Sequence, residues 1–237
     1  MLAIDTTTEA CSVALLNHEE CVEKFQIAPR LHGEIILKMV DEILCENDTQ
    51  LNQIDAFVVN CGPGAFTGVR LGISVIQALA FSQNKKVYSV NTLQIMALQC
   101  LTEIKNKRVD IEKTTLMVAM DARLQELYWQ CFRLNKGKLI PINEAQVGAI
   151  RQLELPHSKE GISYFSCGNG WEIYAQEIEA RLARKCHFMP NQLLPHARSA
   201  LRWVQQNQTE SMEPKLIEPL YIRDKVAKTT AERTMES

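Results

Sequence analysis

The residues best suited to chemistry lie at the end of the first apolar run, where a carboxylate is followed by three hydroxyls in Asp5-Thr6-Thr7-Thr8. A carboxylate and hydroxyls on a tight hairpin can hold a metal-bound phosphate, because backbone amides and side-chain oxygens converge there. The alternative is an ordinary polar turn, closed by hydrogen bonds from its side chains to its backbone. The local pattern alone favours the ordinary turn.

A glycine-rich segment, residues 61–72, follows an apolar run and precedes a helical pattern. This order of strand, glycine loop and helix can form an anion site, because a helix N-terminus carries unpaired N–H groups. The segment is neither a P-loop nor a dinucleotide fingerprint, since no Lys-Ser or Lys-Thr pair follows the glycines. The alternative is a structural loop in which Gly62, Gly64 and Gly68 adopt backbone angles closed to other residues. Physical arguments leave both interpretations open.

Motifs for metal binding and nucleophilic catalysis are lacking in the sequence. His32 opens a helical pattern, but position 36, where a second metal ligand would share its face, is Ile36. No G-x-S-x-G segment is present. The eight cysteines form no C-x-x-C pair, which favours reduced thiols over a zinc or disulfide framework. We therefore expect no metal site and no catalytic residue.

Hydrophobic periodicity predicts the elements that must position these residues. In the first half the predicted strands are 2–5, 11–16, 21–26, 56–60 and 87–90, and the predicted helices are 31–44, 69–81 and 92–101. In the second half the predicted strands are 116–120, 126–134 and 162–167, the glycine turn is 168–170, and the predicted helices are 172–183 and 199–205.

The two halves share one order of elements: a hairpin that opens on an aspartate, then a strand, a glycine turn and a helix. Such an internal duplication predicts two stacked α/β domains. The polar stretch 105–115 is the expected linker, which places the domains at 1–104 and 105–237. The helix near 197–207 is a candidate to join the first domain.

Two of the predicted helices carry more apolar positions than one buried face requires. In 69–81 only Arg70, Ser74 and Gln77 are polar, and 31–44 has a spare apolar edge. Either this surface forms a single buried core, or one face of each helix meets a partner. We predict a partner interface formed by His32, Ile36, Leu37, Val40, Leu44, Val69, Arg70, Ile73, Ile76, Gln77 and Ala80.

The composition excludes some classes of protein. The formal net charge is −2, so no overall basic field would attract RNA. The first residues lack a basic start followed by a long apolar stretch, so we expect neither a signal peptide nor a membrane span.

Four segments together resemble the TsaB (YeaZ) family. They are LAIDTTTEACSVAL at 2–15, the glycine segment 61–72, MDAR at 120–123 with Glu126 and Tyr128, and PLYIR at 219–223 with Val226 and Ala227. The family commonly has Ser at the position of Ala65. These matches occur in order and span nearly the whole chain.

The resemblance implies the two-domain fold shared by actin, hexokinase and acetate kinase, in a degenerate and non-catalytic member. It implies a cytoplasmic scaffold that binds the catalytic paralogue TsaD and, with it, the small ATPase TsaE. That machinery transfers a threonylcarbamoyl group to the adenosine 3′ of the anticodon, in tRNAs reading codons that begin with A. The resemblance also implies a homodimer when TsaD is absent and only indirect contact with tRNA.

The same resemblance makes Asp5, Thr7, Asp121 and Gly168 vestiges of the superfold's phosphate site. No resident cofactor is then expected, beyond a weakly held or interface-bound nucleotide. One alternative is an active ATP-dependent phosphotransferase or ATPase that uses these four residues, and another is a peptidase. A third is direct tRNA binding by a modestly basic tail that contains Arg223, Lys225, Lys228 and Arg233.

Overall fold

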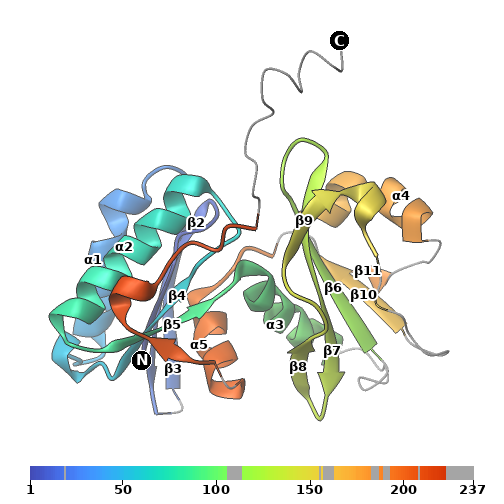
Figure 1. Ribbon diagram of the computed structural model, residues 1–237. Helices are drawn as coiled ribbons and strands as arrows, with labels where there is room; N and C mark the ends of the chain where they lie inside the picture. Colours follow the sequence, from blue (N-terminus) through green and yellow to red (C-terminus); the bar gives the residue numbers. More distant parts are fainter. Residues whose placement is uncertain are drawn as a thin grey trace, which may run out of the picture.

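Two α/β domains stand side by side in the computed structural model (Figure 1). The structure describes residues 1–18, 20–105, 114–154, 156, 163–182, 187–188, 193–207 and 209–222. Most of the predicted linker and the basic tail lie outside these ranges. Among the described residues, no helix is long and apolar enough to cross a bilayer.

The first domain is built on a six-stranded mixed sheet. Its first three strands form an antiparallel meander, and two further strands run parallel to the first of them, in the order β12-β5-β4-β1-β2-β3. The central strands β1 and β4 are almost continuously apolar because helices cover the sheet on both faces. The strands are β1 (Leu2–Asp5), β2 (Ala10–Asn17), β3 (Glu20–Ile27), β4 (Ala56–Asn60), β5 (Lys86–Val90) and β12 (Ser211–Met212).

The second domain repeats this plan. Its sheet has the order β11-β10-β6-β7-β8, which matches β5-β4-β1-β2-β3 strand for strand in both order and direction. The predicted duplication and the predicted actin-like α/β fold class are thus confirmed. The strands are β6 (Thr114–Asp121), β7 (Glu126–Asn135), β8 (Lys138–Pro141), β10 (Ser163–Cys167) and β11 (His187–Phe188), with β9 (Gln146–Ala149) paired to β7.

Each sheet is covered by helices on its two faces (Figure 1). One face of the first sheet carries α1 and α2, and α4 covers the corresponding face of the second. The helices are α1 (His32–Glu46), α2 (Phe66–Ser82), α3 (Thr92–Lys105), α4 (Asn169–Leu182) and α5 (Ala197–Gln206). The short 3₁₀ turns in the described part of the chain are η1 (Leu51–Gln53), η3 (Ile150–Gln152) and η4 (Pro214–Leu216).

The remaining two helices are exchanged between the domains. Helix α3 follows β5 of the first sheet but packs on β6 and β7 of the second. Helix α5 follows the second sheet but packs on β1, β2 and β4 of the first, and the two helices also pack on each other. Their apolar faces merge into one core, in which the rings of Phe132 and Trp203 meet edge to face at 6.0 Å.

This exchange differs from the predicted division at residue 104. That boundary assigns α3 to the first domain, whereas its buried face belongs to the second sheet. The chain then returns to the first domain with α5, β12 and η4. By packing, the first domain comprises residues up to about 91 together with the described residues from 197 onward.

Candidate functional site in the interdomain cleft

A cleft of about 1010 Å³ opens between the domains. Its first wall is formed by the β1–β2 turn, the glycine loop, the start of α2 and residues 29–33. Its second wall is formed by residues 120–123 and Tyr128. The duplicated hairpin turns of the two domains therefore face each other across the cleft.

Asp5 ends β1 but is only 1 % exposed and does not line the cleft. Its Oδ1 accepts hydrogen bonds from the backbone N–H of Thr7 at 2.9 Å and from the Thr7 hydroxyl at 2.8 Å. Its Oδ2 accepts from Nδ2 of Asn60 at 2.6 Å. Asn60 Oδ1 in turn accepts from the N–H of Gly62 at 2.9 Å and lies 3.0 Å from the hydroxyl oxygen of Thr92. This network joins the ends of β1 and β4 to the start of α3.

Burial raises the pKa of Asp5, and the hydrogen bonds from Thr7 and Asn60 only partly offset that effect. Both oxygens of the Asp5 carboxyl group are hydrogen-bonded to groups of the same domain. In this arrangement Asp5 is a structural residue.

Replacing Asp5 with alanine is expected to destabilise the fold by about 3 kcal/mol, because the buried donors of Thr7 and Asn60 lose their acceptor. The raised pKa means that the folded chain holds the Asp5 proton more tightly than the unfolded chain. Asp5 therefore contributes most at acidic pH, and its contribution falls as the pH rises above about 3.9, the ordinary aspartate value. Urea unfolding of the wild type and of Asp5→Ala, measured from acidic to neutral pH, should show a difference in unfolding free energy that shrinks as the pH rises. A cost that grows toward neutral pH would contradict this assignment.

The second domain contains an equivalent arrangement. Asp121 ends β6, and its backbone N–H donates to Oδ1 of Asn169 at 3.0 Å. Its carboxylate accepts from the N–H of Arg123 at 2.9 Å and from the hydroxyl of Tyr174 at 3.2 Å. In both domains the aspartate that ends the first strand is linked to an asparagine near the end of the next parallel strand, through its carboxylate at Asp5 and through its backbone N–H at Asp121. Sequence reasoning missed Asn60, which ends β4 two residues before Gly62, and Asn169, which begins α4 between Gly168 and Gly170.

The glycine loop packs directly against the threonine turn. A Cβ at Gly64 would lie 2.3 Å from the carbonyl oxygen of Thr7, and one at Gly68 would lie 2.1 Å from that of Thr6. The Thr6 hydroxyl donates to the Gly68 carbonyl at 2.7 Å, and Gly62 has a φ of +98°. These glycines permit a close backbone approach, which favours the structural interpretation of the loop.

Comparisons with known proteins agree along the chain. A family model described as "TsaD: tRNA N6-adenosine threonylcarbamoyltransferase" matches residues 24–231. A Haemophilus influenzae protein named tRNA threonylcarbamoyladenosine biosynthesis protein TsaB is 34% identical over 95% of this chain and 94% of its own. The Escherichia coli protein of the same name is 33% identical over 96% of both chains. The chain belongs to the TsaB (YeaZ) family.

A solved TsaB-family structure, YeaZ from Pseudomonas aeruginosa, has the same architecture. It aligns with a TM-score of 0.80 at 33% identity and covers 93% of this chain and 98% of its own. A second Pseudomonas aeruginosa structure, described as having similarity to peptidase YEAZ, gives a TM-score of 0.83 at 34% identity over 94% and 98%.

Against this TsaB fold, the four predicted phosphate-site residues separate into two pairs. Thr7 and Asp121 line the cleft, while Asp5 and Gly168 do not. Gly168 has a φ of +100°, and a Cβ there would lie 2.2 Å from the carbonyl oxygen of Ala119. Gly168 permits close packing of the β10–α4 turn on β6, and its assignment to a vestigial phosphate site stays a prediction. Among the described residues, no three His, Cys, Asp or Glu side chains gather as metal ligands would.

The predicted TsaB partner interface also needs correction at the level of side chains. Eight of its eleven residues are buried in the chain itself and cannot form an exposed contact surface: His32, Ile36, Val40, Leu44, Val69, Ile73, Ile76 and Ala80. The physical reason is that α1 and α2 use these positions to pack on the first sheet and on each other.

Helices α1 and α2 nevertheless carry large exposed apolar side chains. Leu37 is 57 % exposed, and Phe66 and Phe81 are more exposed still. The Arg70 guanidinium lies over the Phe66 ring at 3.3 Å and donates to the hydroxyl of Tyr221. This group, Leu37, Phe66, Arg70, Phe81 and Tyr221, is called the outer α1–α2 surface below.

Proposed function

We propose that this TsaB-family chain is the non-catalytic scaffold of threonylcarbamoyl transfer to tRNA, and that it binds a TsaD transferase and, with it, a TsaE ATPase. The observation that carries the proposal is the 33–34% identity, across about 95% of the chain, to proteins named for threonylcarbamoyladenosine biosynthesis. The acceptor would be the adenosine 3′ of the anticodon.

The geometry of the cleft supports a role without chemistry. A phosphate or acyl-transfer site requires several fixed donors, or a metal, directed at the reacting group. Here the two strand-end aspartates already accept hydrogen bonds from their own domains, and Asp5 is closed off from the cleft.

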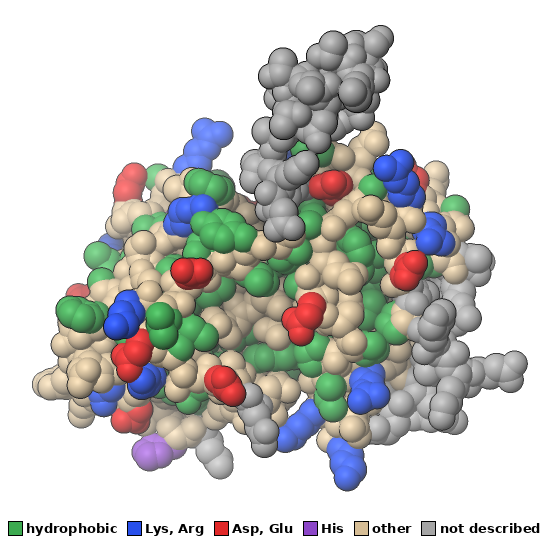
Figure 2. Space-filling view, viewed as in Figure 1, with side chains coloured by type: hydrophobic (Ala, Val, Ile, Leu, Met, Phe, Trp, Pro, Cys, Tyr) green, Lys and Arg blue, Asp and Glu red, His purple; other side chains and the backbone are tan. Residues whose placement is uncertain are grey.

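The outer α1–α2 surface supports a role in protein binding. Aromatic and arginine side chains supply most of the energy in protein interfaces, and Phe66, Arg70 and Tyr221 form such a cluster. On the face shown in Figure 2, basic and acidic side chains are interspersed rather than gathered by sign. This pattern favours docking to a protein over direct binding to tRNA.

Reconstitution from purified components tests the proposal. Threonylcarbamoyladenosine formation by the transferase, TsaE, threonylcarbamoyl-adenylate and tRNA should fall at least about tenfold when this chain is omitted, a typical magnitude of coupling between proteins. Equal rates with and without the chain would contradict a scaffold role. Magnesium-dependent ATP hydrolysis by the chain alone would instead support the phosphotransferase or ATPase alternative.

A further inference from the structure

The polypeptide crosses between the domains at two described places, and polar contacts hold both. At the first crossing, from β5 into α3, the Thr92 hydroxyl donates to the carbonyl of Pro63 at 2.6 Å. Beside it, Nδ2 of Asn91 donates to Oε1 of Gln130, on the second sheet, at 3.1 Å. The second crossing leads through residues 193–196 into α5.

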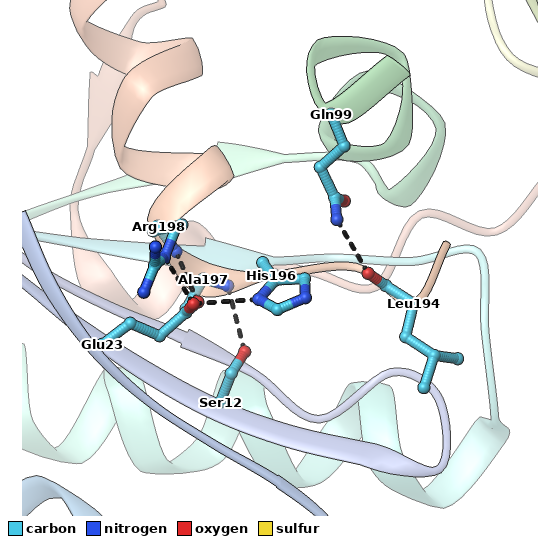
Figure 3. A network of polar contacts seen from close by, with 7 residues as sticks. All are labelled: Ser12, Glu23, Gln99, Leu194, His196, Ala197 and Arg198. Atoms are coloured by element: carbon cyan, nitrogen blue, oxygen red, sulfur yellow. Dashed lines mark hydrogen bonds and ion pairs between the residues drawn. The ribbon is translucent and has the colours of Figure 1, made fainter. Parts of the chain in front are cut away.

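Glu23 of β3 holds the second crossing (Figure 3). Its side chain is 1 % exposed, and one carboxylate oxygen accepts the backbone N–H of Arg198 at 3.0 Å. The other oxygen lies 2.9 Å from Nδ1 of His196 and accepts a bond from Nε of Arg198. Three groups around the start of α5 therefore meet on one carboxylate from a different element.

This carboxylate replaces the cap that α5 lacks in its own sequence. The N-cap residue, His196, makes no capping bond with its side chain, and the first turn contains no acidic residue. The free N–H groups of the first turn are instead satisfied by Glu23 and by the Ser12 hydroxyl, which accepts from Ala197 at 3.0 Å. Strands β2 and β3 of the first domain thus anchor the returning helix.

The segment before α5 is held from both sides. The His196 ring stacks on Phe25 of β3, with centroids 4.2 Å apart and planes 13° from parallel. Two residues earlier, the Leu194 carbonyl accepts from Nε2 of Gln99 at 3.0 Å (Figure 3). Gln99 belongs to α3, which packs on the second sheet, so the crossing is tied to both domains within a few residues.

The electrostatics of Glu23 agree with this geometry. Burial alone would raise the pKa of Glu23, but the contacts with His196 and Arg198 outweigh burial and hold it below the ordinary glutamate value. The contacts with His196 and Arg198 therefore favour the ionised form of Glu23.

We propose that Glu23 is a positioning residue that fixes the start of α5 and thereby holds the two domains at one relative orientation. With both crossings held, the width of the interdomain cleft is set before any partner binds. The alternative is a local helix cap, whose loss would loosen α5 and leave the domain orientation unchanged.

Glu23→Gln tests this, because it keeps the side-chain shape and removes the charge. Glu20→Gln, an exposed position on the same strand, is the matched control. Hydrogen exchange of the α5 first-turn amides should accelerate by roughly tenfold or more in Glu23→Gln and remain unchanged in the control.

The deciding measurement is the distance between spin labels on α2 and β8. Labels on azide-bearing residues at the exposed positions of Ser74 and Lys138 leave the native cysteines unmodified. Excess unlabelled chain restricts the signal to distances within one molecule. The distance distribution should shift or broaden in Glu23→Gln and match the wild type in Glu20→Gln.

An unchanged distribution overturns the proposal, even where α5 exchanges faster, because Glu23 would then be only a cap. If Glu23→Gln does not fold, Arg198→Ala removes the more exposed side of the ion pair and is measured in the same way. A smaller change in the same direction would support the proposed role of Glu23, and a wild-type distribution would overturn it.

Discussion

Replacing Gly68 with alanine is expected to destabilise the first domain severely, by about 4 kcal/mol or more. The added methyl would lie 2.1 Å from the Thr6 carbonyl oxygen, so backbone would meet backbone with no flexible side chain to move aside. Helix α2 cannot withdraw easily, because the Thr6 hydroxyl is bonded to the Gly68 carbonyl and the N–H of Ala65 to the Thr7 carbonyl. Domains of ordinary stability have only about 5–15 kcal/mol to lose.

Urea denaturation followed by circular dichroism measures this effect, and Gly33→Ala is its control. Gly33 lies in the first turn of α1 with open space around its Cβ position. Alanine there should leave stability unchanged or raise it by up to about 1 kcal/mol, since it is the better helix former. Wild-type stability of Gly68→Ala would show that the contact between α2 and the threonine turn is not close-packed.

The sequence located best those strands that are buried on both faces. The predictions at 2–5 and 56–60 coincide with β1 and β4, because a continuous apolar run bounded by polar residues has few other interpretations. Helix starts were less accurate. Helix α2 begins at Phe66 and α4 at Asn169, each three residues before the predicted start, because Gly68 and Gly170 in their first turns are typical of loops. Tertiary packing overrides propensity there.

Features that depend on distant partners were not predicted. Strand β12 has two residues, Ser211 and Met212, and exists only because β5 offers an open edge. The helix near 197–207 was a candidate to join the first domain, but nothing in the sequence indicated that α3 packs on the second sheet, since an apolar helix face has the same pattern whichever sheet it covers. The contacts of Glu23 with His196 and Arg198 join residues more than 170 positions apart in the sequence.

The interface prediction failed in part for the same reason. Counting apolar positions on α2 gave a surplus, but the chain's own C-terminal segment covers some of it. Nε2 of Gln77 donates to the carbonyls of Pro214 and Ile217, both at 3.0 Å, and Ile217 is buried in the same core as α2. The exposure of each side chain distinguishes positions that a partner can contact from positions already packed inside the chain's own core.

Leu37 is one of the exposed positions that a partner can reach. Leu37→Glu should leave the free chain folded, because a side chain that is 57 % exposed keeps its charge hydrated. In a complex formed through the outer α1–α2 surface, the same carboxylate would be trapped against apolar groups without a partner. We expect affinity for the TsaD transferase to fall at least about a hundredfold, the size of a typical hot-spot effect.

Ile76→Glu provides the contrast within the same pair of helices. Ile76 is 0 % exposed, so a charge there must be buried on folding and should unfold the first domain. Loss of binding by that variant would carry no information about the interface, which is why Leu37 is the better probe.

The matched control is Ile173→Glu, on α4 of the second domain. Ile173 is 52 % exposed, so this change adds the same charge to an apolar side chain of similar exposure, away from the outer α1–α2 surface. Calorimetric titration of the three proteins with the transferase should find binding by the wild type and Ile173→Glu and none, or very weak binding, by Leu37→Glu. If Leu37→Glu binds normally and Ile173→Glu does not, the partner docks on the second domain. The added carboxylate lowers affinity only at a position that the partner buries.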